Sequence, residues 1–148
     1  MRYLGIDYGS KRVGLAISDE EGKMAFPYKI LTNNLELDDS IHNICGQEEI
    51  SAIVLGESYN QLGEKNKIMG SIEEFKRNIE AELGIPVYLE KEFMTTVFAR
   101  EMMMEATGFL KKTEKSAKKL AKGKIDKADA SAATLILQRF LDRKNIQQ

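Results

Sequence analysis

The sequence has 148 residues, of which 43% are hydrophobic and 30% charged, an ordinary composition for one soluble globular domain with its own core. The formal net charge of −1 argues against a protein that coats nucleic acid through bulk charge, so such a contact requires a local basic segment. A single cysteine and a single histidine exclude an internal disulfide and a cysteine-rich zinc site, which leaves hard, oxygen-ligated cations as candidate metals.

In chain order, the apolar residues predict three strands, a helix, a strand, a helix, a strand and then two helices. The expected bounds are 3–7, 13–18 and about 23–31 for the first strands, 35–45 for a helix, 50–56 for a strand, about 67–83 for a helix, 87–89 for a strand, and 95–107 and about 126–143 for the last helices. Pro27 favours an edge or bulged position for the third strand, because proline cannot donate to a ladder. The order indicates one α/β domain over residues 1–148, in which an antiparallel half built from hairpins joins parallel strands through helices.

Asp7 stands at the carboxyl end of the first strand, where the chain enters a turn. One interpretation is that Asp7 only caps the turn that contains Gly9 and Ser10, because aspartate bonds readily to its own backbone in turns. The other is that it belongs to a functional site, since a carboxylate leaving a buried strand needs an ion-pair partner, a hydrogen bond or a metal. The functional interpretation therefore requires further acids nearby.

Further acids follow two of the later strands and begin the last helix. Glu57 and Glu92 each come shortly after an apolar strand, and the carboxyl ends of neighbouring parallel strands meet at the edge where ligand sites lie. Asp126 and Asp129 are three residues apart and share one helix face, although helix capping and the helix dipole also explain acids there. Converging carboxylates repel one another, so the set predicts divalent cations. Two such metals activate a water in phosphodiester cleavage.

A basic segment, residues 111–127, lies between the last two predicted helices and holds eight lysines against two acids. One interpretation is a solvated, mobile loop; the other is a clamp on a phosphate backbone, which gains affinity by releasing counterions. The two are compatible. The residues assigned to nucleic-acid binding are Lys11 and Arg12 of the first turn with Lys111, Lys112, Lys115, Lys118, Lys119, Lys122 and Lys124.

Four blocks stand out in order: LGIDYGSKRVGLAISD at 4–19, IVLG with NQLG at 53–63, EFMTT with a later alanine at 92–99, and DASAA with ILQ and FL at 129–141. Together they resemble the YqgF family of ribonuclease H-like proteins, described as Holliday-junction-resolvase-like or as pre-16S rRNA nucleases, over essentially the whole chain. The resemblance implies a mixed five-stranded sheet flanked by helices. It also implies a nuclease centre at Asp7, Glu92 and Asp129 that uses Mg²⁺ or Mn²⁺ in a two-metal arrangement.

The sequence departs from the family pattern in two places. The family reads Asp-Glu-Arg before the threonines, whereas this chain has Lys91, Glu92 and Phe93 and so keeps only the glutamate. An arginine there could hold a phosphate through two hydrogen bonds, and phenylalanine cannot. Glu57 occupies the position where true junction resolvases of the wider superfamily carry an acid. We therefore include Glu57 among the predicted catalytic residues, with an incidental loop residue as the alternative.

Three functions are compatible with these residues. The first is a metal-dependent nuclease that processes the 5′ end of pre-16S rRNA, with Holliday-junction cleavage as its alternative reaction. The second is a phosphotransferase of the sugar-kinase type, which also begins with an Asp-x-Gly loop; that fold needs two lobes, and 148 residues supply one. The third is a ribosome-associated RNA-binding protein with a weakened site, which the missing Asp and Arg keep open.

The expected partner is nucleic acid, with pre-rRNA preferred to branched DNA on the ground of the family alone. Ribosomal particles are a further candidate partner, and the chain is expected to be a monomer or a homodimer. No membrane partner and a cytoplasmic location are expected, because the sequence contains neither a signal peptide nor an apolar run near 18 residues.

Overall fold

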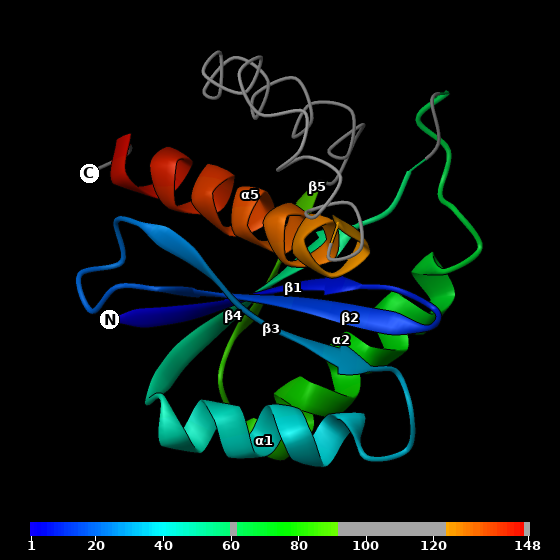
Figure 1. The fold of residues 1–148 in the computed structure, drawn as a ribbon, viewed down its shortest axis with the longest axis horizontal. Coiled ribbons are helices and arrows are strands. Elements are labelled where there is room, and N and C mark those ends of the chain that lie inside the picture. Colours follow the sequence, from blue (N-terminus) through cyan, green and yellow to red (C-terminus); the bar gives the residue numbers. More distant parts are fainter. Residues whose placement is uncertain (60–61, 92–123, 147–148) are drawn as a thin grey trace.

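The computed structural model describes residues 1–59, 62–91 and 124–146, with only the backbone described for 124–131. This part of the chain forms a five-stranded mixed sheet with helices on both faces (Figure 1). The strands are β1 (Arg2–Tyr8), β2 (Arg12–Ser18), β3 (Ala25–Thr32), β4 (Ile50–Glu57) and β5 (Val87–Lys91); the helices are α1 (Leu37–Gln47), α2 (Met69–Leu83) and α5 (Lys124–Ile146). Among the described residues, no helix is long and apolar enough to cross a membrane.

The strand order β3-β2-β1-β4-β5 confirms the predicted mixture of a hairpin-built half and a parallel half. β1 pairs with β2, and β2 with β3, in antiparallel register, whereas β1, β4 and β5 run parallel to one another. The carboxyl ends of β1, β4 and β5 therefore lie along a single edge of the sheet, which is called the carboxyl edge below. In open sheets with helices on both faces, this is the edge that carries ligand sites.

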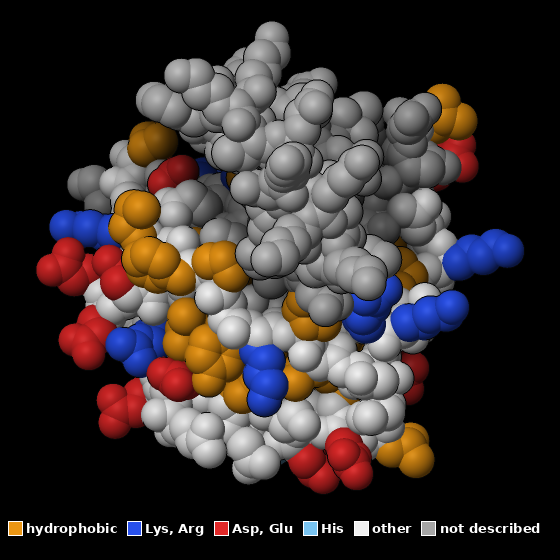
Figure 2. All heavy atoms as spheres, in the orientation of Figure 1, with side chains coloured by type: hydrophobic (Ala, Val, Ile, Leu, Met, Phe, Trp, Pro, Cys, Tyr) orange, Lys and Arg blue, Asp and Glu red, His pale blue; other side chains and the backbone are white. Residues whose placement is uncertain are grey.

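Pro27 lies where the sequence predicted, in an edge strand with an irregular register. In the pairing of β2 with β3, Leu15 opposes Lys29 and Ala16 opposes Pro27, so that Tyr28 is passed over. Proline lacks a backbone N–H, and such a bulge removes the demand for one. Figure 2 shows hydrophobic side chains gathered on the surface over β3, and Phe26 within this strand is 49% exposed.

The face covered by α1 and α2 holds a core of branched and aromatic side chains. α2 contributes Ile72, Phe75 and Ile79 from one stripe, the 3.6-residue period that the sequence shows. The helix ends at Gly84, whose φ of 65° is the left-handed conformation that glycine adopts at little cost. The buried residues of this face come from six elements: Leu4, Ile6, Val13, Leu15, Leu37, Ile41, Ile44, Cys45, Ile50, Ile53, Leu55, Met69, Ile72, Phe75, Ile79 and Val87.

The opposite face is built from small residues, so that α5 lies very close to the sheet. A Cβ atom placed on Gly5 would lie 2.7 Å from Leu137 Cβ and 3.0 Å from the carbonyl oxygen of Ala133. Only glycine fits there without movement of the helix. Ala16 and Ala52 on neighbouring strands are also fully buried against α5.

Several predicted bounds need correction. The last helix begins at Lys124 rather than Asp126 and continues to Ile146 rather than Arg143, so the end of the supposed basic loop is helical. Lysine has a high helix propensity, and a run of lysines therefore does not mark a helix boundary. β5 extends two residues beyond the predicted 87–89. The predicted helix 95–107 and residues 111–123 of the basic segment lie outside the described residues.

Candidate active site at the carboxyl edge

Asp7 lies near the carboxyl end of β1, on the face that α5 covers. Side chains alternate along a strand, and Tyr3 and Gly5 both contact α5, so the next residue on that face is Asp7. Its Cα pairs with that of Gly14 in β2, and its side chain is half-buried. A half-buried carboxylate at this edge is a donor of the kind that Mg²⁺ and Mn²⁺ prefer, so the residue fits the implied metal.

The turn after Asp7 is held tightly by backbone contacts. The Gly9 N–H donates to the carbonyl of Arg12 at 2.9 Å, and a Cβ on Gly9 would lie 2.4 Å from that same oxygen. Asn33 closes the loop from β3, donating from Nδ2 to the carbonyl of Gly9 at 2.8 Å and from its backbone N–H to the carbonyl of Lys11 at 2.9 Å. The exposed side chains of Lys11 and Arg12 are therefore presented by a fixed backbone beside Asp7.

The backbone of α5 brings Asp129 toward the same place. Gly5 meets Ala133 and Leu137, while Tyr3 meets Phe140, so the helix runs antiparallel to β1. Asp129 comes four residues before Ala133, which is about one helical turn, or about 6 Å along the helix axis. The two residues therefore lie on the same side of α5.

Two residues forward from Gly5 is a step of about 6.6 Å along β1 and leads to Asp7. The helix step to Asp129 and the strand step to Asp7 are of similar length and point in the same direction. The backbone thus places Asp7 and Asp129 together at the carboxyl edge. Asp126, three residues earlier, shares the helix side of Asp129.

Glu57 ends β4 at the same edge, but on the other face of the sheet. Ile53 and Leu55 belong to the core under α1 and α2, and alternation puts Glu57 on their side. The β4 residue on the face of Asp7 is instead Gly56. The register of α5 on β1 thus carries the backbone of Asp129 toward the end of β1 where Asp7 lies, whereas Glu57 belongs to the other face of the sheet.

The Tyr59 hydroxyl donates a hydrogen bond to Glu57 Oε2. This bond to a carboxylate raises the pKa of the Tyr59 phenol, with burial adding to the effect. Lys65 pairs Cα positions with Tyr59 across an isolated bridge and donates from Nζ to Glu73 of α2 at 2.9 Å. The contacts of Glu57 thus belong to the loop that joins β4 to α2, a connection that position-by-position sequence reasoning overlooked.

The remaining predicted site residues lie beyond what the structure describes. Glu92 follows the last residue of β5 in the sequence but is outside the described residues, as are Lys111, Lys112, Lys115, Lys118, Lys119 and Lys122. Lys124 begins α5, and its side chain is not described. Within residues 1–59, 62–91 and 124–146, no group of three or more His, Cys, Asp or Glu residues forms a metal cluster. The metal ligand set stays a prediction for that reason.

Comparisons with known proteins agree on a family and on a fold. The family model described as "RuvX: Holliday junction resolvase" matches residues 1–143. A protein of Maridesulfovibrio salexigens named "Putative pre-16S rRNA nuclease" is 30% identical over 145 residues, covering 97% of this chain and 99% of its own length. A protein of the same name from Bacteroides fragilis is 34% identical over 152 residues, with 98% and 99% covered.

Several solved structures similar to this one are Holliday junction resolvases. RuvC of T. thermophilus, in complex with a Holliday junction substrate, matches with a TM-score of 0.59 at 15% identity, covering 97% of this chain and 96% of that one. The yeast mitochondrial Holliday junction resolvase matches with a TM-score of 0.52 at 14% identity, covering 94% and 77%. At these identities the likeness establishes the fold, which is the ribonuclease H-like architecture that the sequence predicted.

Proposed function

Because the chain belongs to the RuvX family of Holliday junction resolvases, we propose that it is a divalent-metal-dependent nuclease that processes the 5′ end of pre-16S rRNA. Two curated relatives carry the name "Putative pre-16S rRNA nuclease" and match over nearly their whole length, which supports pre-16S rRNA as the substrate. The proposal puts the protein in the cytoplasm, in contact with ribosomal precursor particles.

The observation that carries this proposal is the contact of Gly5 with α5. It sets the register in which the helix crosses β1, and this register supports an approach of Asp129 to Asp7. Any residue larger than glycine at this position would hold the helix off the strand. The closeness of two carboxylate-bearing residues from distant parts of the sequence favours a metal site over a capped turn.

In the proposed mechanism, Asp7, Glu92 and Asp129 would hold the metal through carboxylate oxygens. Two divalent cations, when bound, supply an activated water and stabilise the leaving oxygen. Lys11 and Arg12 contact the phosphate backbone from the rigid turn beside Asp7, and the lysines of the basic segment extend that contact. Glu57 acts on the other side of the sheet by holding Tyr59 and the loop between β4 and α2, rather than as a catalytic residue.

Holliday-junction cleavage is the second candidate activity. The family description and the likeness to RuvC in complex with a junction favour it. Both substrates have a phosphodiester backbone, and in the proposal either backbone is cleaved at the carboxyl edge. The chemistry proposed for Asp7 and Asp129 is therefore the same for both. The choice between them therefore depends on a comparison of substrates.

The experiment compares three substrates under one condition: a 5′-extended 16S rRNA fragment, the same fragment with a mature 5′ end, and a four-way DNA junction, each with Mg²⁺ or Mn²⁺. We expect cleavage of the extended RNA only. Cleavage of the junction alone would replace the proposed substrate, and cleavage of none of the three in either metal would overturn the nuclease proposal in favour of RNA binding.

Metal binding is measured by calorimetry on the wild type, on Asp129→Asn and on the matched control Asp142→Asn. Asp142 is exposed on the same helix, and its Oδ1 accepts from Gln138 at 2.9 Å, which an asparagine can still do. We expect binding that weakens at least about tenfold in Asp129→Asn and is unchanged in the control, since only the first removes a ligand. Equal loss in both variants would contradict the assignment.

A further inference from the structure

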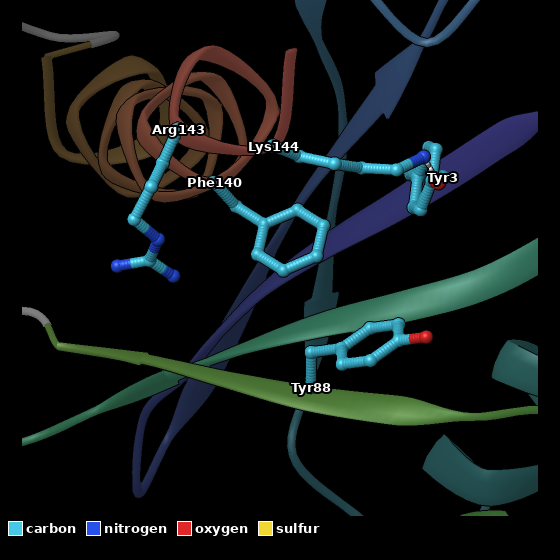
Figure 3. A pocket seen from close by; sticks show the side chains of 5 residues that line it. All are labelled: Tyr3, Tyr88, Phe140, Arg143 and Lys144. Atoms are coloured by element: carbon cyan, nitrogen blue, oxygen red, sulfur yellow. Dashed lines mark hydrogen bonds between the residues drawn. The ribbon is translucent and has the colours of Figure 1, made fainter. Parts of the chain in front are cut away.

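A pocket of about 270 Å³ lies at the far end of α5 from Asp129 (Figure 3). It is lined by three aromatic rings and two cations: Tyr3, Tyr88, Phe140, Arg143 and Lys144. Small-molecule sites are commonly about 300–1,000 Å³. This volume is slightly below that range, which favours a small ligand.

The three aromatic rings of the pocket lie against one another, and those of Tyr88 and Phe140 are partly exposed. The rings of Tyr88 and Phe140 lie 5.2 Å apart between centroids at an interplanar angle of 29°, and Tyr3 meets Phe140 at 5.9 Å with a tilt of 57°. Tyr88 is on the edge strand β5 and remains 43% exposed. Tyr88 therefore leaves part of its side chain open to a ligand beside the ring of Phe140.

The two tyrosines lie on strands that flank β4. In the pairing of β1 with β4, Tyr3 opposes Ala52, and in the pairing of β4 with β5, Val54 opposes Tyr88. Ala52 and Val54 are fully buried in the core beneath α5, so the pocket is formed above them by the larger side chains of the flanking strands and of α5.

The cations are held differently. Arg143 donates to both carboxylate oxygens of Glu90, which is 4% exposed, so its guanidinium plane is fixed and its charge is matched. Lys144 donates to the hydroxyl of Tyr3, and its ammonium lies 4.5 Å from the centroid of that ring. Two cations and one carboxylate leave the lined pocket with one net positive charge, carried by Lys144.

We propose that this pocket binds one nucleobase of a single-stranded segment of the nucleic-acid substrate, with Lys144 contacting the adjacent phosphate. Single-stranded nucleic acid is recognised by aromatic platforms combined with cations along the backbone, which is the chemistry present here. The proposal rests on the proposed nuclease function and names the part of the substrate that the protein grips away from the cleaved bond.

The position of the pocket sets its role relative to the carboxyl edge. Tyr3 and Asp7 are four residues apart on β1, about 13 Å along the strand. Arg143 and Asp129 are fourteen residues apart on α5, about 21 Å along the helix. A strand that occupies both places runs alongside α5, so the pocket fixes how far the cleaved bond lies from a gripped base.

The test measures binding of labelled single-stranded RNA by fluorescence anisotropy, with EDTA in place of metal so that cleavage plays no part. Tyr88→Ala is compared with Phe26→Ala, a matched control because Phe26 is 49% exposed on the other edge strand, β3. We expect at least about tenfold weaker binding for Tyr88→Ala and no change for Phe26→Ala. Lys144→Gln should reduce the slope of log affinity against log salt by about 0.7.

A reporter variant tests stacking directly. The chain contains no tryptophan, so Tyr88→Trp gives a single tryptophan, whose fluorescence can be excited selectively, on the exposed side of the pocket. We expect its emission to be quenched by single-stranded RNA, and duplex RNA of the same length to quench it less.

Emission of Tyr88→Trp that single-stranded RNA does not quench, together with unchanged RNA affinity of Tyr88→Ala, would overturn the pocket proposal. Contact with another protein would then be the remaining role for the exposed rings. Wild-type chain that binds no single strand would overturn it as well. Neither result bears on the nuclease, because cleavage by the wild type is scored separately with metal present.

Discussion

The two faces of the sheet are packed in different ways. The face under α1 and α2 is filled by large branched and aromatic side chains, whereas the α5 face has Gly5, Ala16 and Ala52 at its centre. Large side chains bury more apolar area, at about 25 cal/mol per Å², and so contribute more to stability. Small ones let a helix backbone approach closely. One face therefore provides most of the stability, and the other fixes the position of a helix that carries a site residue.

The largest contrast is expected between the acids on the two faces. Asp7→Asn removes a proposed metal ligand and several kcal/mol of transition-state stabilisation, so cleavage should fall at least about 1,000-fold. Glu57→Gln keeps a side-chain acceptor for Tyr59 on the opposite face and should retain most of the activity. Single-turnover cleavage rates measure both. A loss in Glu57→Gln as large as that in Asp7→Asn would end the distinction and restore Glu57 as a ligand.

Core truncation separates stability from activity. Ile72→Ala empties a fully buried position under α2 and should lower the free energy of unfolding by about 2–5 kcal/mol, while cleavage per folded molecule is unchanged. Leu137→Ala should cost a similar amount and also slow cleavage, because Leu137 lies on Gly5. Urea denaturation with cleavage assays under folding conditions checks both. Slower cleavage in folded Ile72→Ala would mean that the two faces do not divide their roles.

A single methyl group tests the close approach of α5. Gly5→Ala should destabilise the fold by about 1–3 kcal/mol and reduce metal affinity, because the helix must move away from β1. The matched control is Gly70→Ala in α2, where an added Cβ meets nothing within 4 Å and the change should be neutral or stabilising by up to about 1 kcal/mol. Thermal unfolding and calorimetry with Mn²⁺ measure the pair. Unchanged metal affinity in Gly5→Ala would show that the metal site does not depend on the contact between Gly5 and α5.

The smallest effect is expected in the reactivity of Cys45, which is buried under the sheet on the α1 and α2 face. Burial raises the pKa of this thiol to about 11, so at pH 8 its thiolate fraction is on the order of 100-fold below that of an exposed cysteine. Labelling by a thiol reagent should therefore be slow and should accelerate as pH rises toward 11. Gly5→Ala should leave the labelling rate of Cys45 unchanged. Faster labelling of Cys45 in this variant would show that the two faces of the sheet open together.

The sequence predicts the elements of the sheet well, because strand signals here are local. Apolar runs bounded by Gly, Asp and Pro define β1, β2 and β4, and Pro27 identifies an edge strand. The beginning of α5 was misplaced because lysines are good helix formers and give no boundary signal.

Positions within the site were harder to predict than the elements. The place of Glu57 after a strand predicts a site residue, whereas the alternation of Ile53 and Leu55 indicates that its side chain is on the opposite face from Asp7. The pocket of Tyr3, Tyr88 and Phe140 had no sequence signal at all, because three separate elements build it. Local patterns specify elements, whereas a site depends on which elements meet.

The contact between Gly5 and Ala133 joins β1, the first described strand of the sequence, with α5, the last described helix. During translation β1 and its hairpin partners leave the ribosome early, but the position facing Asp7 stays empty until α5 has emerged. A partly made chain can thus assemble most of its sheet and still lack Asp129 at the carboxyl edge. If the proposed site is correct, a nascent copy therefore gains cleavage activity only after α5 has been synthesised and has docked on the sheet.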